Sequence, residues 1–205
     1  MSHELRTALN ANLGFTETIR DTLLGPIGTG AYRDYARHTH ESSEYFLPPF
    51  NDRLTMSRIE LGKMELDKGD RHVSQLVDEC LTLVVGDAAS KGFTIDISVI
   101  DSDVRVSGDR RAIKQITIKL LSSAVKITSS QGPIDIDASG NEESLMTITV
   151  IHTGVSTNTR DIARILEPLI RLEQAETGTG LCLPLAKSLV ELHGGELLTQ
   201  SQPGI

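Results

Sequence analysis

A histidine followed at once by a glutamate, with a threonine one helical turn after the histidine, stands at the start of the chain: His3, Glu4 and Thr7 in "SHELRT". A neutral imidazole can attack a phosphoryl group, and an adjacent carboxylate can hold its tautomer or take its proton. On a helix, Thr7 shares a face with His3, where its hydroxyl can position a water. The same residues also make an ordinary capped helix start, because Ser2 is a good N-cap and Glu4 suits the positive end of the helix dipole.

Two helices must position these side chains. The spacing of apolar residues predicts a helix over residues 2–24, ended by "GPIGTG" at 25–30, and a second helix from about Ala31 to about Leu61 that closes at Gly62. The apolar seam of the first helix comprises Leu5, Leu9, Leu13, Thr16, Ile19 and Leu23. Two helices cannot enclose a core alone, so we expect an antiparallel hairpin that dimerises into a four-helix bundle.

Two adjacent prolines interrupt the second helical pattern. Pro48 and Pro49 lie in "LPPFND", in the interior of the predicted helix. Each removes a backbone donor and costs about 3 kcal/mol in a helix interior. We therefore expect a kink or break near Phe46 to Leu47.

From Glu65 onward the pattern alternates between strand and helix. We expect strands in "MELDKG", "GFTIDISVI", "PIDIDAS", "SLMTITVIHTG" and "GELLTQS". We expect helices over 72–92, 109–128, 159–166 and 181–193, with a glycine-rich turn at 178–180. The predicted fold class is therefore α+β: a helical hairpin followed by an α/β sandwich, with helices on one face of a mixed sheet.

The composition excludes several classes of partner. The 205 residues carry 20 basic and 28 acidic side chains, a net charge of −8, which argues against a nucleic-acid surface. No run of 18 apolar residues and no signal pattern occurs, so we expect a cytoplasmic chain without a membrane segment. No metal site is predicted, because Cys80 and Cys182 are too few for one, and His38 and His40 face different directions on a helix.

The order of these motifs resembles that of sensor histidine kinases. "MSHELRTALNANLGF" resembles their phosphoacceptor box, "RLTMSRIELGKMEL" the end of their second dimerisation helix, and "DRRAIKQITIKLLSSAVKIT" their N box. "ILEPLIR" resembles the F box, and "GTGLCLPLAKSLVELHGGEL" the second glycine box. The hairpin segments "GPIG" and "YRDYARHTHES" are most similar to those of alphaproteobacterial cell-cycle kinases.

The resemblance implies a homodimeric phosphoacceptor hairpin over 1–62 and an ATPase-like domain of the Bergerat type over 63–205. The phosphorylated histidine that such a hairpin carries corresponds to His3, and the partner that the resemblance implies is the receiver domain of a response regulator. The chain stops at "QPGI", before the strand that usually completes the family's sheet, so we expect a truncated domain.

The metal-binding motif departs from the family. The two asparagines of the N box, which hold magnesium and phosphate, correspond to Lys119 and Ser123, and only Lys126 is retained. A lysine ammonium repels the cation whose ligand it replaces.

The adenine-binding and glycine-rich motifs depart as well. His152 stands for the aspartate that accepts from adenine, and Ser156 and Cys182 stand for glycines. The lid, "IRLEQAETG", is short.

Five residues remain as nucleotide contacts carried over from the family. They are Lys126, Gly154, Gly178, Thr179 and Gly180. A Gly-Thr-Gly run before a helix can cradle phosphate, but it is also an ordinary strand-to-helix turn.

Three functions stay open. The intact acceptor motif beside altered nucleotide contacts favours an ATP-independent histidine phosphotransferase or phosphatase, which uses His3 and needs no cofactor. The alternatives are an active kinase that uses ATP and magnesium, and a non-catalytic pseudokinase scaffold that binds response regulators.

Overall fold

The computed structural model describes residues 2–26, 28–90, 92, 94–100, 105–128, 132–140, 145–153, 164–168 and 180–202. The chain divides into two compact units, Met1–Leu54 and Thr55–Ile205. The predicted domain boundary after residue 62 stays a prediction. Among the residues described, no helix has both the length and the apolar character needed to cross a membrane.

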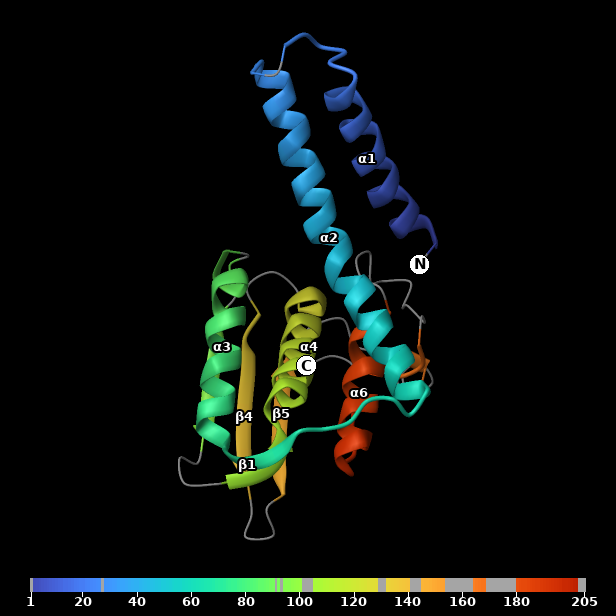
Figure 1. The fold of residues 1–205 in the computed structure, drawn as a ribbon. Helices are drawn as coiled ribbons and strands as arrows, with labels where there is room; N and C mark the ends of the chain where they lie inside the picture. The colour runs from blue at the N-terminus through green and yellow to red at the C-terminus, as the bar shows by residue number, and fades with distance from the viewer. Residues whose placement is uncertain are drawn as a thin grey trace. The chain divides into compact units, whose positions relative to one another are not determined.

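The first unit is a helical hairpin built from α1 (Ser2–Arg20) and the beginning of α2 (Gly30–Glu60). The two helices lie alongside each other (Figure 1). Asn12 Nδ2 donates to Ser43 Oγ at 3.0 Å, and the rings of Phe15 and Tyr35 stack with centroids 5.3 Å apart. These contacts place an amphipathic face of each helix against the other.

The first helix is shorter than predicted. It ends at Arg20, and residues 21–24 form a turn in which Thr22 takes a left-handed conformation with φ 48°. The backbone N–H of Leu24 donates to the hydroxyl of the buried Tyr32 at 3.2 Å. Leu23, the last residue of the predicted apolar seam, is 69% exposed. It therefore gives no burial energy that would stabilise a longer helix.

Of the kink or break predicted near Phe46 to Leu47 in the second helix, the break is wrong. Helix α2 runs continuously from Gly30 to Glu60 with Pro48 and Pro49 inside it. The missing proline N–H groups leave two backbone carbonyls without their usual donors, but the hydrogen bonds of the flanking turns maintain the helix. It ends as predicted at Gly62, whose φ is 63°, where the Lys63 N–H reaches the Arg58 carbonyl at 2.9 Å.

The described part of the second unit contains two sheets. Strand β1 (Lys68–His72) pairs antiparallel with β3 (Arg105–Asp109). Strands β2 (Ile95–Ile100), β4 (Ile134–Gly140) and β5 (Met146–His152) form the other sheet, in the order β2-β4-β5. The β2–β4 pair is parallel and the β4–β5 pair is antiparallel, which confirms the predicted mixed sheet and its hairpin.

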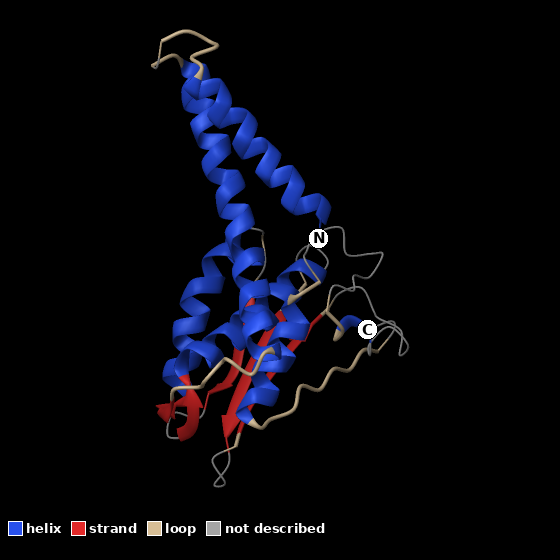
Figure 2. Cartoon of the chain, turned by 45° about the vertical axis from the view of Figure 1, so that its right-hand side comes forward, coloured by secondary structure: helices blue, strands red, loops and turns tan. Residues whose placement is uncertain are grey.

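Helices α3 (Val73–Ser90) and α4 (Arg110–Ile127) cover one face of the three-stranded sheet (Figures 1 and 2). Their apolar side chains meet alternate residues of the strands in one core that includes Val77, Leu121, Ile134 and Ile136. Helix α6 (Cys182–His193) packs on α4 in a second cluster, which includes Ala112 and Leu189. Helices therefore lie on one face of the sheet, as predicted.

Two segments differ from the prediction. Strand β3 was not predicted, and "GELLTQS" forms no strand, because Leu197 packs against the cluster under α6 rather than extending the sheet. The predicted helix over 159–166 lies mostly outside the described residues. In the described residues 164–168, Arg164 and Ile165 are helical, and the Glu167 N–H donates to the Arg164 carbonyl at 3.0 Å.

Candidate functional site

The candidate phosphoacceptor lies in the first turns of α1. The backbone of His3, Glu4 and Thr7 is helical, so the β-carbons of His3 and Thr7 share one face. Thr7 is exposed. The side chains of His3 and Glu4 lie outside the part of the chain that the structure describes.

Two of the five predicted nucleotide contacts lie in the described residues. Lys126 is exposed in the last turn of α4, and Gly180, with φ 66°, directly precedes Leu181, the N-cap of α6. Gly154, Gly178 and Thr179 lie outside the described residues. The left-handed φ of Gly180 favours glycine, which explains why this residue type stands before the helix.

The packing of α4 and α6 brings these two positions toward one end of the helix pair. The helices run antiparallel, since the backbone N–H of Asp109, just before α4, donates to Nε2 of His193, the last residue of α6, at 3.2 Å. The beginning of α6 therefore lies toward the C-terminal half of α4. Lys119, Ser123 and Lys126 occupy one face of that half.

The chemistry of this face differs from that of a magnesium site. Lys119 and Ser123 are half-buried on α4. An ammonium has three donors and no acceptor, so it can contact an anion but cannot ligate a metal. The two lysines thus favour contact with an anion that carries no bound metal cation.

The first turn of α6 also offers fewer donors than a phosphate-binding helix start. Leu181 is the N-cap and makes no side-chain capping bond. Pro184 lies in the first turn and has no backbone N–H, so only Cys182 and Leu183 present free amides among the first three helical positions. Sequence reasoning missed this loss, although the proline in "CLPLAK" was a visible signal.

The end of α4 approaches the end of β5. A β-carbon on Gly132 would lie 2.4 Å from Thr153 Oγ1 and 2.7 Å from Thr128 Cγ2, so only glycine fits between these two threonines. His152 precedes Thr153 and pairs with Ile134 across the sheet. The close approach brings the β5 end, with His152, beside the C-terminal end of α4.

His152 is half-buried, and its Nδ1 has no hydrogen-bond partner among the described residues. Burial lowers the pKa of this imidazole, because desolvation disfavours the charged form. A neutral histidine can accept one hydrogen bond, but it lacks the negative charge of the aspartate at this position in the family.

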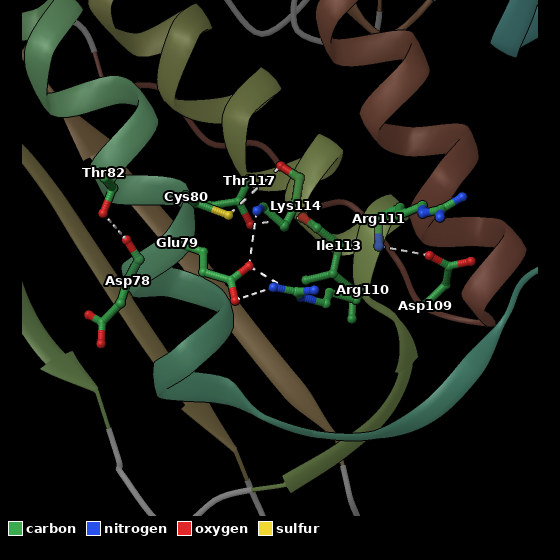
Figure 3. A network of polar contacts seen from close by, with 10 residues as sticks. All are labelled: Asp78, Glu79, Cys80, Thr82, Asp109, Arg110, Arg111, Ile113, Lys114 and Thr117. Atoms are coloured by element: carbon green, nitrogen blue, oxygen red, sulfur yellow. Dashed lines mark hydrogen bonds and ion pairs between the residues drawn. The ribbon is translucent and has the colours of Figure 1, made fainter.

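A separate polar network joins α3 to α4 (Figure 3). Glu79 accepts from Arg110 and from Lys114, whose Nζ lies 2.9 Å from Glu79 Oε2. The hydrogen bond from Arg110, followed by that from Lys114, lowers the pKa of the Glu79 carboxylate. Cys80 beside it is buried, and burial raises the pKa of its thiol, so this network is structural and contains no activated nucleophile.

Within the described ranges, no group of three or more histidine, cysteine, aspartate or glutamate side chains is arranged to hold a metal ion. The His38 ring contacts Glu41 at 3.4 Å from its Nδ1 and lies 5.7 Å from the ring of Phe15.

Comparison with known proteins agrees with this architecture. The family described as "Histidine kinase-, DNA gyrase B-, and HSP90-like ATPase" matches residues 108–205. The "Histidine protein kinase DivJ" of Caulobacter vibrioides is 36% identical over 207 residues, covering 100% of this chain and 34% of that protein. The "Cell-division control histidine kinase PdhS" of Brucella abortus is 31% identical over 216 residues, covering 100% of this chain and 21% of that protein.

The solved structures include full-length ShkA in complex with AMPPNP, with a TM-score of 0.74 and 26% identity over 94% of this chain and 40% of that one. The Acinetobacter baumannii histidine kinase AdeS has the same fold, with a TM-score of 0.66 and 19% identity over 93% of this chain and 86% of that one. The chain spans between a fifth and about a third of the two curated relatives. These matches show that the chain belongs to the sensor histidine kinase family and spans its catalytic-core region.

Proposed function

We propose that the chain relays phosphate through His3, to or from the receiver aspartate of a response regulator, without using ATP itself. One contrast carries the proposal. The acceptor motif keeps its histidine, glutamate and threonine, whereas Lys119, Ser123 and His152 replace the metal and adenine contacts. Pro184 further reduces the donors at the start of α6.

The transfer step needs no nucleotide. The unprotonated imidazole nitrogen of His3 attacks the phosphorus of an aspartyl phosphate, the P–O bond to the aspartate breaks, and the aspartate leaves as a carboxylate. Glu4 holds the tautomer of the ring or takes its proton. In the phosphatase reaction, Thr7 positions the water that hydrolyses the partner's aspartyl phosphate.

Loss of the nucleotide contacts has a calculable consequence. Losing two contacts worth about 1.5 kcal/mol each weakens binding by roughly a hundredfold. A micromolar ATP site would then bind only at concentrations of about 0.1 mM or above.

The test is transfer from a panel of phosphorylated receiver domains in the absence of ATP. We expect the wild-type chain to acquire acid-labile phosphate, and His3→Gln to acquire none. Glu4→Gln should slow the transfer, and Thr7→Ala should mainly impair dephosphorylation of the receiver. His38→Gln is the matched control, because it removes a histidine from the other helix of the hairpin.

Two outcomes would contradict the relay. If no receiver labels the wild type, or if the His3 variant labels equally, the chain acts as a scaffold that binds response regulators. Binding of a receiver domain by a chain that acquires no phosphate from it would identify that scaffold function.

An ATP-dependent kinase is the second candidate, favoured by the similarity to ShkA, whose structure holds AMPPNP. Calorimetry with magnesium and ATP distinguishes the two. We expect no micromolar binding by the wild type and a gain in affinity on Lys119→Asn, Ser123→Asn and His152→Asp combined. A micromolar dissociation constant for the wild type would favour the kinase.

A further inference from the structure

The ring of His193 ties the end of α6 to the start of α4. Its Nδ1 lies 2.8 Å from the carbonyl oxygen of Leu189, and its Nε2 lies 3.2 Å from the backbone nitrogen of Asp109. A carbonyl only accepts, so Nδ1 carries the proton. A backbone N–H only donates, so Nε2 presents its lone pair, and the two contacts together require a neutral ring in one tautomer.

Asp109 extends this connection to two further segments. Its Oδ1 accepts from the N–H groups of Arg111 and Ala112 at 2.8 and 3.0 Å, which caps α4. Its Oδ2 accepts from the N–H of Asp67 at 2.8 Å, in the segment between α2 and β1. Asp109 and His193 therefore join that segment, β3, α4 and α6 at one point.

We propose that the contact between His193 and Asp109 is a pH-sensitive latch that holds α6 in register on α4. A proton taken up at Nε2 turns the acceptor into a donor that faces another donor, so the hydrogen bond from the Asp109 N–H is lost. The latch is independent of the phosphate relay proposed above, because it uses none of the residues of the acceptor motif.

The charged groups around the His193 ring have opposing effects on a positive charge at the ring. From β1, the Lys68 ammonium lies 3.5 Å from the His193 carbonyl oxygen and opposes a second positive charge. The Asp109 carboxylate and the C-terminal end of the α6 dipole favour that charge, but the carboxylate already accepts three N–H groups. On α6 itself, Lys187 and Glu191 are 3.8 Å apart and exposed enough for water to screen them.

The latch affects the far end of the same helix. Leu185, Ala186 and Leu189 of α6 are fully buried against α4, so a change of register at His193 moves the whole apolar face. The other end of α6 begins at Cys182, two residues after Gly180, one of the predicted nucleotide contacts. Protonation at one end is thereby linked to the geometry at the other.

NMR of the complete chain tests the latch without a substitution. At about pH 8 we expect the Nδ1–H tautomer of His193 and a protected Asp109 amide. As the pH is lowered from about 8 and the ring takes up a proton, the protection factor of that amide should fall by about fivefold to tenfold, the effect of one net hydrogen bond. The amide of Thr128, which bonds the Ala124 carbonyl at the other end of α4, should not change.

His193→Gln is the matched variant, because its side-chain oxygen can accept from Asp109 but does not titrate. We expect it to keep the Asp109 amide protected at every pH. Constant protection in the wild type while His193 titrates, or the opposite tautomer at about pH 8, would overturn the latch.

Discussion

At the scale of the residue, Asp109 caps a helix and anchors a distant segment with a single carboxylate. Burial acts to raise the pKa of Asp109, but the hydrogen bonds from three backbone N–H groups lower it overall. The ionised form is thus the stabilising one. Its contribution is complete above about pH 4, where the unfolded carboxylate is also ionised, and is lost as the pH falls through the lower folded pKa.

Replacing this carboxylate should be costly. We expect Asp109→Ala to lower the free energy of unfolding by about 1–2 kcal/mol for the lost cap, and by about 1 kcal/mol more for the freed Asp67 N–H. Urea denaturation at neutral pH measures the change. Asp70→Ala, which removes the exposed ion pair with Arg105, is the control and should cost at most about 1 kcal/mol. Equal losses in the two variants would contradict the role of Asp109.

His152 predicts a second pH dependence, of opposite chemical origin. Because burial lowers the pKa of His152, the unfolded chain takes up the proton first as the pH falls below about 6.5. Stability should therefore decline from about pH 7 toward pH 5. In His152→Gln this part of the decline should disappear, which urea denaturation across that range measures. An unchanged slope would mean that His152 is as free to protonate in the folded chain as in the unfolded one.

At the scale of the element, α2 is a continuous helix that contains two prolines. Pro48 and Pro49 supply no N–H, so the carbonyls of Glu44 and Tyr45 lack their ordinary helical partners. The local preference against helix is outweighed by the turns on either side. The helix persists at a cost in stability.

Removing that cost should stabilise the chain. We expect Pro48→Ala and Pro49→Ala each to raise the free energy of unfolding, by up to about 3 kcal/mol, with the helical content unchanged or slightly increased. Circular dichroism and chemical denaturation measure the two quantities. Ser57→Ala, at an exposed position of the same helix, should change stability by less than about 1 kcal/mol. A loss of stability in the proline variants would show that the prolines support the native helix.

At the scale of the whole molecule, the helical hairpin leaves several large apolar side chains exposed to solvent. In the described part of the first unit, the large apolar side chains that are about half exposed or more are Leu13, Leu23, Leu24, Tyr45, Leu47, Phe50 and Leu54. Members of the histidine kinase family form homodimers, and these side chains suit a four-helix bundle between two copies.

We expect the chain to sediment at micromolar concentration as a species of twice 22.3 kDa. Leu47→Asp combined with Phe50→Asp should shift it to the monomer, because both place a charge on the exposed apolar face. Ser57→Asp on the same helix should leave the dimer intact. A wild-type chain that sediments only as a monomer would exclude the bundle.

The sequence by itself determined the elements whose signals are local. Apolar spacing and the Asp109 cap defined α4, alternation defined the β4–β5 hairpin, and the glycines after α2 and α6 marked where those helices end. The acceptor motif and the altered nucleotide contacts stay predictions from residue types, because each depends on identity and spacing along one stretch of chain.

Only the tertiary structure decided the features that depend on distant partners. Strand β3 has one large apolar residue, Val106, and is a strand because β1 pairs with it. "GELLTQS" has strand character yet stays outside the sheet, because Leu197 packs under α6. The bond from Asp109 to His193 joins residues 84 positions apart. Whether such contacts form depends on the entropy cost of loop closure and on the packing energy across the whole unit. No local sequence pattern indicates the balance of these two quantities.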